Sequence, residues 1–77
     1  MLNLEIVKCK VTNKDKLEDW IILYIAGYPA YKILPNGEID ETDPITPNGC
    51  GIYYNNKEFV DKWLKNNFAN VARQVRH

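Results

Sequence analysis

Residues 4–11, LEIVKCKV, come close to a strict alternation of apolar and polar side chains. From Ile6 onward, one face of an extended segment would carry Val7, Cys9 and Val11, and the other face would carry lysines. A period of two with β-branched residues is typical of a half-buried β-strand. The pattern therefore predicts a strand in this segment.

Residues 14–26 allow two interpretations, because periodicity alone does not separate a helix from a strand in a short apolar run. A helix would have an apolar face at a spacing of 3.6 residues, made by Leu17, Trp20, Ile21, Tyr24 and Ile25. A strand would suit the isoleucine and aromatic residues, and residues 27–29 would turn the chain into a second strand over 30–34. The strand is favoured slightly, because residues 30–34 need a neighbour to pair with.

The tripeptide Pro-Asn-Gly occurs twice, at residues 35–37 and 47–49. Asn-Gly between apolar segments marks a tight reversal, because both residues tolerate positive φ angles. Pro35 suits the first central position of a type I turn, with Gly37 left-handed, so we expect a hairpin tip here. The second copy is expected to lead, through flexible glycines, into a short strand over residues 52–54.

The last part of the chain predicts a helix that starts at Asn55. Asn55 is a suitable N-cap, and Glu58 three residues later makes a variant of the capping box. The apolar stripe of this helix would consist of Phe59, Trp63, Leu64, Phe68, Val71 and Val75. The whole pattern predicts an α+β fold. A small antiparallel sheet of three to four strands would pack against a long C-terminal amphipathic helix, with residues 14–26 as a strand or a second helix.

Length and composition narrow the class of protein. A chain of 77 residues is expected to form a single domain over residues 1–77, with a thin margin of stability. The longest apolar run, residues 20–27, is too short to span a membrane, and the first residues do not resemble a signal peptide. Two cysteines make no disulfide framework, so we expect a cytoplasmic protein with reduced thiols and no membrane partner.

No residue pattern points to an enzyme, a metal site or a cofactor. Cys50 lies between two glycines, but a reactive cysteine needs a base, and the one histidine is the terminal His77. Cys9, Cys50 and His77 are too scattered for zinc, and the acidic residues after Gly37 do not follow the EF-hand pattern. Neither a GxGxxG nor a GxxxxGK phosphate loop occurs. We therefore expect no catalytic, cofactor-binding or metal-binding residues.

Nucleic-acid binding is the alternative function. Exposed tyrosines could stack on bases, and the cations that could meet phosphates are Lys8, Lys10, Lys32, Arg73 and Arg76. The formal net charge is zero, however, and an acidic stretch would repel phosphate. Nucleic acid is therefore the less favoured partner.

Protein recognition is the favoured function. Five tyrosines and two tryptophans are a high aromatic content, and such residues dominate binding hot spots. The helix would leave one face of the sheet uncovered, and the tyrosines expected there are Tyr24, Tyr28, Tyr31 and one of Tyr53 and Tyr54. Tyr28 and Tyr31 are the expected anchors.

An acidic loop beside that face is expected to steer a basic partner, through Glu38, Asp40, Glu41 and Asp43. The predicted function is therefore a small non-enzymatic interaction module that binds a protein partner. Inhibitors and adaptors encoded by phages offer an analogy by size. Homodimerisation through the same face is the other outcome considered, because it would add stability that a small core lacks.

Overall fold

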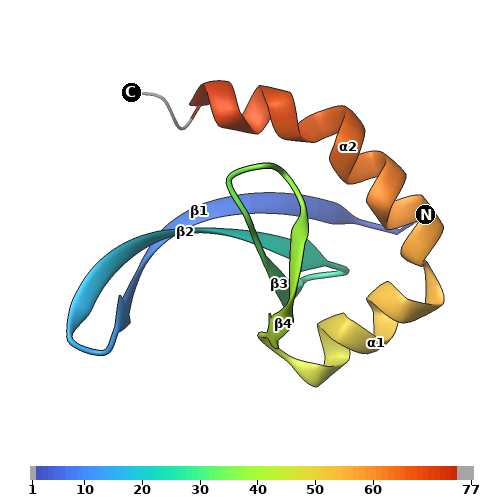
Figure 1. Cartoon of the computed structure of the whole chain (residues 1–77). Helices are drawn as coiled ribbons and strands as arrows, with labels where there is room; N and C mark the ends of the chain where they lie inside the picture. Colours follow the sequence, from blue (N-terminus) through green and yellow to red (C-terminus); the bar gives the residue numbers. More distant parts are fainter. Residues whose placement is uncertain (1, 75–77) are drawn as a thin grey trace.

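The computed structural model describes the backbone of residues 2–74 and the side chains of residues 2–69 (Figure 1). The elements along these residues are β1 (Leu4–Asn13), β2 (Lys16–Ile25), β3 (Tyr28–Ile33), β4 (Ile39–Pro44), α1 (Pro47–Asn55) and α2 (Lys57–Gln74). The strands form one antiparallel sheet in chain order, each pairing with the next. The predicted α+β fold class is confirmed, and the segment 14–26 contributes a strand instead of a second helix.

The hairpin of β1 and β2 is the longest feature of the sheet. Both strands are 10 residues long, and they pair along their whole length. Lys14 and Asp15 form its turn with φ angles of 51° and 67°, as a two-residue turn that matches the twist of the strands requires. The polar stretch around this turn contains no glycine, so the pattern did not predict it. Figure 1 shows the tip of this hairpin extending away from both helices.

The predicted hairpin tip at the first Pro-Asn-Gly is confirmed. The amide of Gly37 donates to the carbonyl of Leu34, and the amide of Leu34 donates to the carbonyl of Glu38, both at 2.8 Å. Gly37 has a φ of +90°, as the left-handed position requires. A Cβ atom at this position would lie 2.9 Å from Cδ2 of Phe68. The glycine therefore lets the hairpin tip rest directly on α2.

The second Pro-Asn-Gly opens α1, and the expected strand over residues 52–54 is wrong. Thr46 is the N-cap: its Oγ1 accepts the amide N–H of Gly49 at 3.3 Å and donates to the carbonyl of Pro29 at 2.7 Å. Pro47 follows at the start of the helix, where its missing N–H costs nothing. The sequence Thr-Pro-Asn-Gly is thus a capped helix start, which local turn propensity does not distinguish from a turn.

Gly49 gives close packing, and the expected flexibility at this position is wrong. A Cβ atom there would lie 2.8 Å from Cα of Ala30 and 2.9 Å from the carbonyl oxygen of Pro29. Because the glycine has no side chain, α1 lies directly on β3. Gly51, by contrast, faces open space.

The hydrophobic core lies between one face of the sheet and the two helices. Its buried side chains are Leu23, Ile25, Ala30, Tyr31, Ile33, Tyr53, Val60 and Leu64. The rings of Tyr31 and Tyr53 meet edge to face, with centroids 5.2 Å apart. Burial raises the pKa of both tyrosine hydroxyls, so both stay protonated at physiological pH.

The start of α2 differs slightly from the expected one. Asn56 caps the end of α1, and its carbonyl accepts the amide N–H of Val60 at 3.0 Å, so α2 starts two residues later than expected. The predicted stripe is wrong at Phe59, which is 50% exposed. The side chains of α2 that face the core along this line are instead Val60, Leu64 and Phe68. Val75 and the side chain of Val71 lie outside the described residues.

Candidate functional site

The sheet has a second face, which carries a row of apolar side chains. Because Ile6 pairs with Leu23 and both belong to the core side, the flanking pair of Val7 and Ile22 points to the opposite side. Side chains two residues apart share a face of a strand. We call the resulting set the open strip: Val7, Cys9 and Val11 on β1, with Trp20, Ile22 and Tyr24 on β2. None of these six residues packs into the core cluster, although Ile22 is buried at 7% exposure and the other five are half-buried.

Trp20 is the largest side chain of the open strip, and two contacts hold it in place. Its Nε1 donates to Oε1 of Glu18 at 3.0 Å. The ammonium group of Lys32 lies 4.6 Å from the centre of the ring. Cys9 stands directly opposite on β1. The indole is therefore held in a defined orientation.

Carboxylates stand at both ends of the open strip, and a third lies two strands away on one long side. Glu5 faces Tyr24 across the hairpin at one end of the strip, and Glu18 faces Val11 at the other end. Asp40 lies on β4 at the side, pointing away from the core because its neighbour Ile39 packs against the core. The remaining long side of the strip is the free edge of β1.

Local hydrogen bonds keep two of these carboxylates ionised. Hydrogen bonds from the side chains of Trp20 and Asn13 lower the pKa of Glu18. The hydroxyl and the backbone amide of Thr42 lower the pKa of Asp40. Both groups are therefore negatively charged at neutral pH.

Two cations share this face of the sheet. Lys32 pairs with Asp40 across β3 and β4 and reaches over the ring of Trp20. Lys16 lies at the tip of the hairpin, beyond Glu18. Lys32 is engaged and Lys16 stands outside the strip, so the border of the open strip is predominantly acidic.

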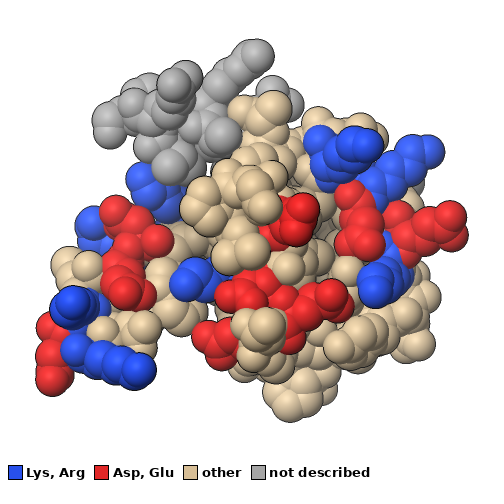
Figure 2. All heavy atoms as spheres, in the orientation of Figure 1, with Lys and Arg blue, Asp and Glu red and all other residues tan. Residues whose placement is uncertain are grey.

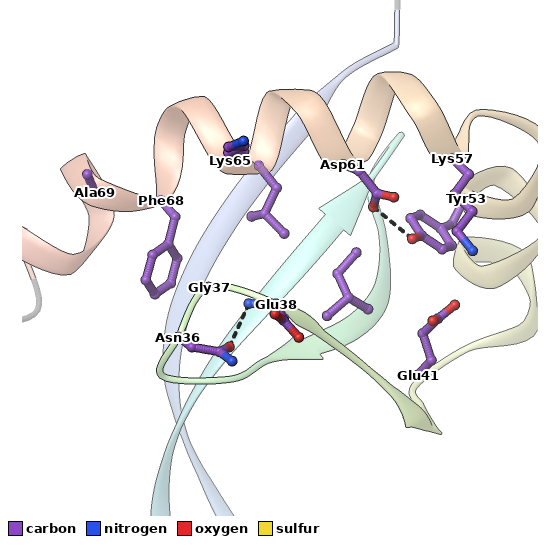
Figure 3. Close-up of a pocket in the computed structure, with 12 residues that line it drawn as sticks. Asn36, Gly37, Glu38, Glu41, Tyr53, Lys57, Asp61, Lys65, Phe68 and Ala69 are labelled. Atoms are coloured by element: carbon purple, nitrogen blue, oxygen red, sulfur yellow. Dashed lines mark hydrogen bonds between the residues drawn. The ribbon is translucent and has the colours of Figure 1, made fainter.

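A groove of about 550 Å³ lies on the other side of the molecule, between the β3–β4 hairpin and α2 (Figure 3). Its apolar lining residues include Ile39, Tyr53, Leu64 and Phe68. Its charged lining residues are Glu38, Glu41, Lys57, Asp61 and Lys65. The hydroxyl of Tyr53 donates to Oδ1 of Asp61 at 2.8 Å, as Figure 3 shows. The charged side chains are exposed and carry both signs, so the groove defines no single chemistry.

The two predicted anchors differ in their placement. Tyr31 is 1% exposed and lies in the core, so the expectation that it stands on the uncovered face is wrong. Tyr28 is 44% exposed at the start of β3. Of the other tyrosines, Tyr24 lies in the open strip as expected, whereas Tyr53 is buried and Tyr54 is exposed on α1.

The four predicted steering carboxylates do not share one surface. Glu38 and Glu41 line the groove beside α2, whereas Asp40 points to the open face. Asp43 is exposed near the end of β4. Figure 2 shows carboxylates gathered over β4 in the centre of the view, so the acidic character of the segment is evident even though its side chains separate.

The predicted phosphate-binding cations separate in the same way. Lys8 and Lys10 lie on the core side of the hairpin, where Lys10 forms an ion pair with Asp19 at 2.8 Å. Lys32 lies on the opposite face. Arg76 and the side chain of Arg73 fall outside the described residues.

The sequence held a signal for the open strip that strand prediction alone did not use. Ile6 and Val7 are adjacent apolar residues, and they interrupt the alternation of β1. Leu4 and Ile6 face the core, while the apolar residues from Val7 onward face away from it. A strand that changes its apolar face in this way carries apolar side chains on both faces of the sheet.

No protein-family model, curated protein or solved structure matches this chain. Neither helix, over the residues described, has an apolar stretch long enough to cross a membrane. Within the same residues, no three His, Cys, Asp or Glu side chains come together as metal ligands do.

Proposed function

We propose that this protein is a small non-enzymatic interaction module that binds another protein through the open strip. The observation that carries the proposal is the row of six apolar side chains on the face of the sheet that no described helix side chain covers, with an oriented tryptophan among them. Five of the six are half-buried, and Ile22 is buried among them at 7% exposure. Contiguous apolar patches rimmed by polar groups mark interaction sites, and Trp and Tyr dominate the energy of such sites.

The small size of the chain strengthens this argument. A domain of this length buries only about 60% of the surface that its unfolded chain exposes. Apolar side chains that point away from the core are less buried than they could be, so they contribute less to the free energy of folding of a small domain. Burial of these side chains against a partner would add that contribution to the stability of the complex.

The orientation of Trp20 also favours binding. Fixing a free side chain costs about 0.5–1.5 kcal/mol when a complex forms. Glu18 and Lys32 already hold the indole in the free protein. A partner therefore meets a surface that needs little reordering.

Part of the acidic loop predicted from the sequence would still steer a basic partner toward the open strip. In this proposal Asp40 contributes to steering from the edge of the open face, and Glu41 and Asp43 add to the field of β4 at longer range. Tyr28 lies outside the open strip as defined here and is a peripheral contact at most. Cys9 and Cys50 are free thiols, which fits our proposal of a cytoplasmic location.

A site-specific photocrosslinker tests the proposed function. We would replace Tyr24, in the open strip, with benzoylphenylalanine, and use Tyr54 as the matched control because it is an aromatic residue on α1 that is 62% exposed. In an extract of the source cells, position 24 should crosslink to one protein that position 54 does not reach. Adding Trp20→Ser should abolish that product while circular dichroism shows an intact fold.

Three results would overturn the proposal. They are the absence of a product from position 24, the same product from position 54, and a product that survives Trp20→Ser. A crosslink from position 24 only to a second copy of the chain would replace the partner by a homodimer.

A further inference from the structure

We infer that the open strip receives an amphipathic helix of the partner, whose apolar stripe is flanked by lysine or arginine. This inference rests on the proposed function and specifies the partner that the strip fits. It follows from the shape of the strip, from the charges around it, and from the cost of covering it with a second copy of the chain.

The apolar part of the open face is narrow. Across the sheet it covers β1 and β2 and reaches β3 only at Pro29, which pairs with Tyr24. Further along, Lys32 on β3 and Asp40 on β4 occupy the same face with charged groups. Two neighbouring strands are about 5 Å apart, and a helix with its side chains is about 10 Å wide. A second sheet laid on this face would bury the charges of β3 and β4. One helix along the hairpin would not.

The length of the strip also fits a helix. Tyr24 lies opposite Glu5, so the strip runs over six residue steps, from that level to Val11. At about 3.4 Å per residue the strip is roughly 20 Å long. A helix rises about 1.5 Å per residue, so about 14 residues, or nearly four turns, would cover it.

The charges around the strip select the flanks of that helix. Glu5 and Glu18 stand at the two ends, and Asp40 stands at the side. Lys32 already contacts Trp20 and opposes Asp40, so it leaves a net negative border. Lysine or arginine beside the apolar stripe of the partner would meet these carboxylates, whereas aspartate, glutamate or phosphate would be repelled.

The same charges disfavour a second copy laid face to face. Such a dimer would bring the carboxylate border of one strip against the carboxylate border of the other. Like charges placed together at an interface oppose association. The strip is therefore better suited to a basic partner than to itself.

Three synthetic peptides of roughly 14 residues test the inference, long enough to have measurable helix content. All three carry the same leucine stripe, flanked by lysine, by glutamine or by glutamate. Binding to the intact, isotope-labelled protein would be followed by two-dimensional NMR. The lysine peptide should shift the amide signals of Val7, Cys9 and Ile22, and should bind about tenfold more tightly than the glutamate peptide at low salt, as expected for two or three surface charge contacts. Salt at about 0.5 M should remove most of that difference.

A matched pair of triple variants shows whether the border causes the preference. Glu5→Gln, Glu18→Gln and Asp40→Asn together should make the lysine and glutamate peptides bind alike. Glu38→Gln, Glu58→Gln and Asp61→Asn remove the same charge from the groove and helix side and should leave the tenfold preference intact. A preference lost equally in both triple variants would reflect net charge alone, and would overturn the inference.

Other outcomes separate this inference from the proposed function. Equal binding of all three peptides at the strip would overturn the basic partner and leave a protein-binding strip in place. Shifts confined to α2 and the groove, or no binding at all, would overturn the helical partner, while the crosslinking experiment decides the proposed function independently. A concentration-dependent dimer that shifts the same strip signals in the absence of peptide would overturn the inference in favour of self-association.

Discussion

The two faces of the β1–β2 hairpin carry apolar rows of similar kind but reach different degrees of burial. On the covered face Leu23 and Ile25 have no exposed surface, because α1 and α2 pack above them. On the open face Trp20 and Tyr24, on the same strand, remain partly exposed, and Ile22 between them is 7% exposed. Period-two alternation produces both rows, and only the placement of the helices separates a core from a surface.

The polar residues of the hairpin sharpen this comparison. Beyond the helices, the covered side carries charged residues, with Lys10 paired to Asp19 at 2.8 Å. The open side stays apolar as far as Val11, where Glu18 faces it. The hairpin therefore turns its apolar side away from the core where the helices end. The open strip is therefore a separate apolar surface and does not continue the hydrophobic core.

The largest expected effect compares one residue from each face. Leu23→Ala should lower the free energy of unfolding by about 2–5 kcal/mol, because it removes a fully buried side chain and leaves a cavity. Val7→Ala, on the open strip, should cost about 1 kcal/mol, because a partly exposed side chain has less burial to lose. Urea denaturation followed by circular dichroism measures both. Equal losses would mean that the open strip is as much a core as the covered face.

A smaller effect concerns how α1 sits on the covered face. Gly49→Ala would place a methyl group 2.8 Å from Cα of Ala30, so α1 must shift, at a cost of about 1–3 kcal/mol. Gly51→Ala is the control in the same helix. Its methyl group meets open space and should stabilise the protein by about 0.5–1 kcal/mol. Thermal unfolding of the two variants should therefore move in opposite directions, and a shift of the same sign for both would contradict the packing described for Gly49.

The cap of α1 gives a third, smaller effect. Thr46→Ala removes the hydroxyl that accepts the amide of Gly49 and donates to the carbonyl of Pro29, and should cost about 1–2 kcal/mol. Thr46→Ser keeps both hydrogen bonds and should retain most of the stability. The same denaturation experiment tests the pair. If Ser and Ala were equally destabilising, the hydroxyl would have no part in joining α1 to β3.

Much of the fold follows from local signals, and the failures have a common cause. The turn at Gly37 was predictable because Asn-Gly defines its own geometry within four residues. The start of α1 was not, because its Pro-Asn-Gly looks like a turn until Gly49 meets Ala30 from a distant strand. Local propensity does not contain such a contact.

The candidate site shows the same limit at the level of whole faces. Alternation predicted that Val7, Cys9 and Val11 share a side, but it does not tell which side the helices cover. Tyr31 was assigned to the wrong face for a related reason. The register of β3 shifts at an irregularity beside Leu23, and a one-residue slip moves every later side chain to the other face.

The smallest expected effect distinguishes the faces by their carboxylates. Glu18 and Asp19 are adjacent on β2 and point to opposite sides, and each has its pKa lowered by a different partner. The largest cause is the indole N–H of Trp20 for Glu18 and the ammonium of Lys10 for Asp19. Trp20→Phe should therefore raise the pKa of Glu18 toward its usual range and leave that of Asp19 unchanged. Lys10→Ala should do the reverse.

Carbon-detected NMR titration of the side-chain carboxyl groups measures both variants. A folded pKa below the unfolded value means that ionisation stabilises the fold. This contribution is complete above the unfolded pKa and is lost as the pH falls through the folded pKa. Each variant should therefore lose part of the acid-sensitive stability that its own face supplies. Movement of both carboxyl groups in either variant would show that the two faces are electrostatically coupled, and the open strip could then not be treated as a separate surface.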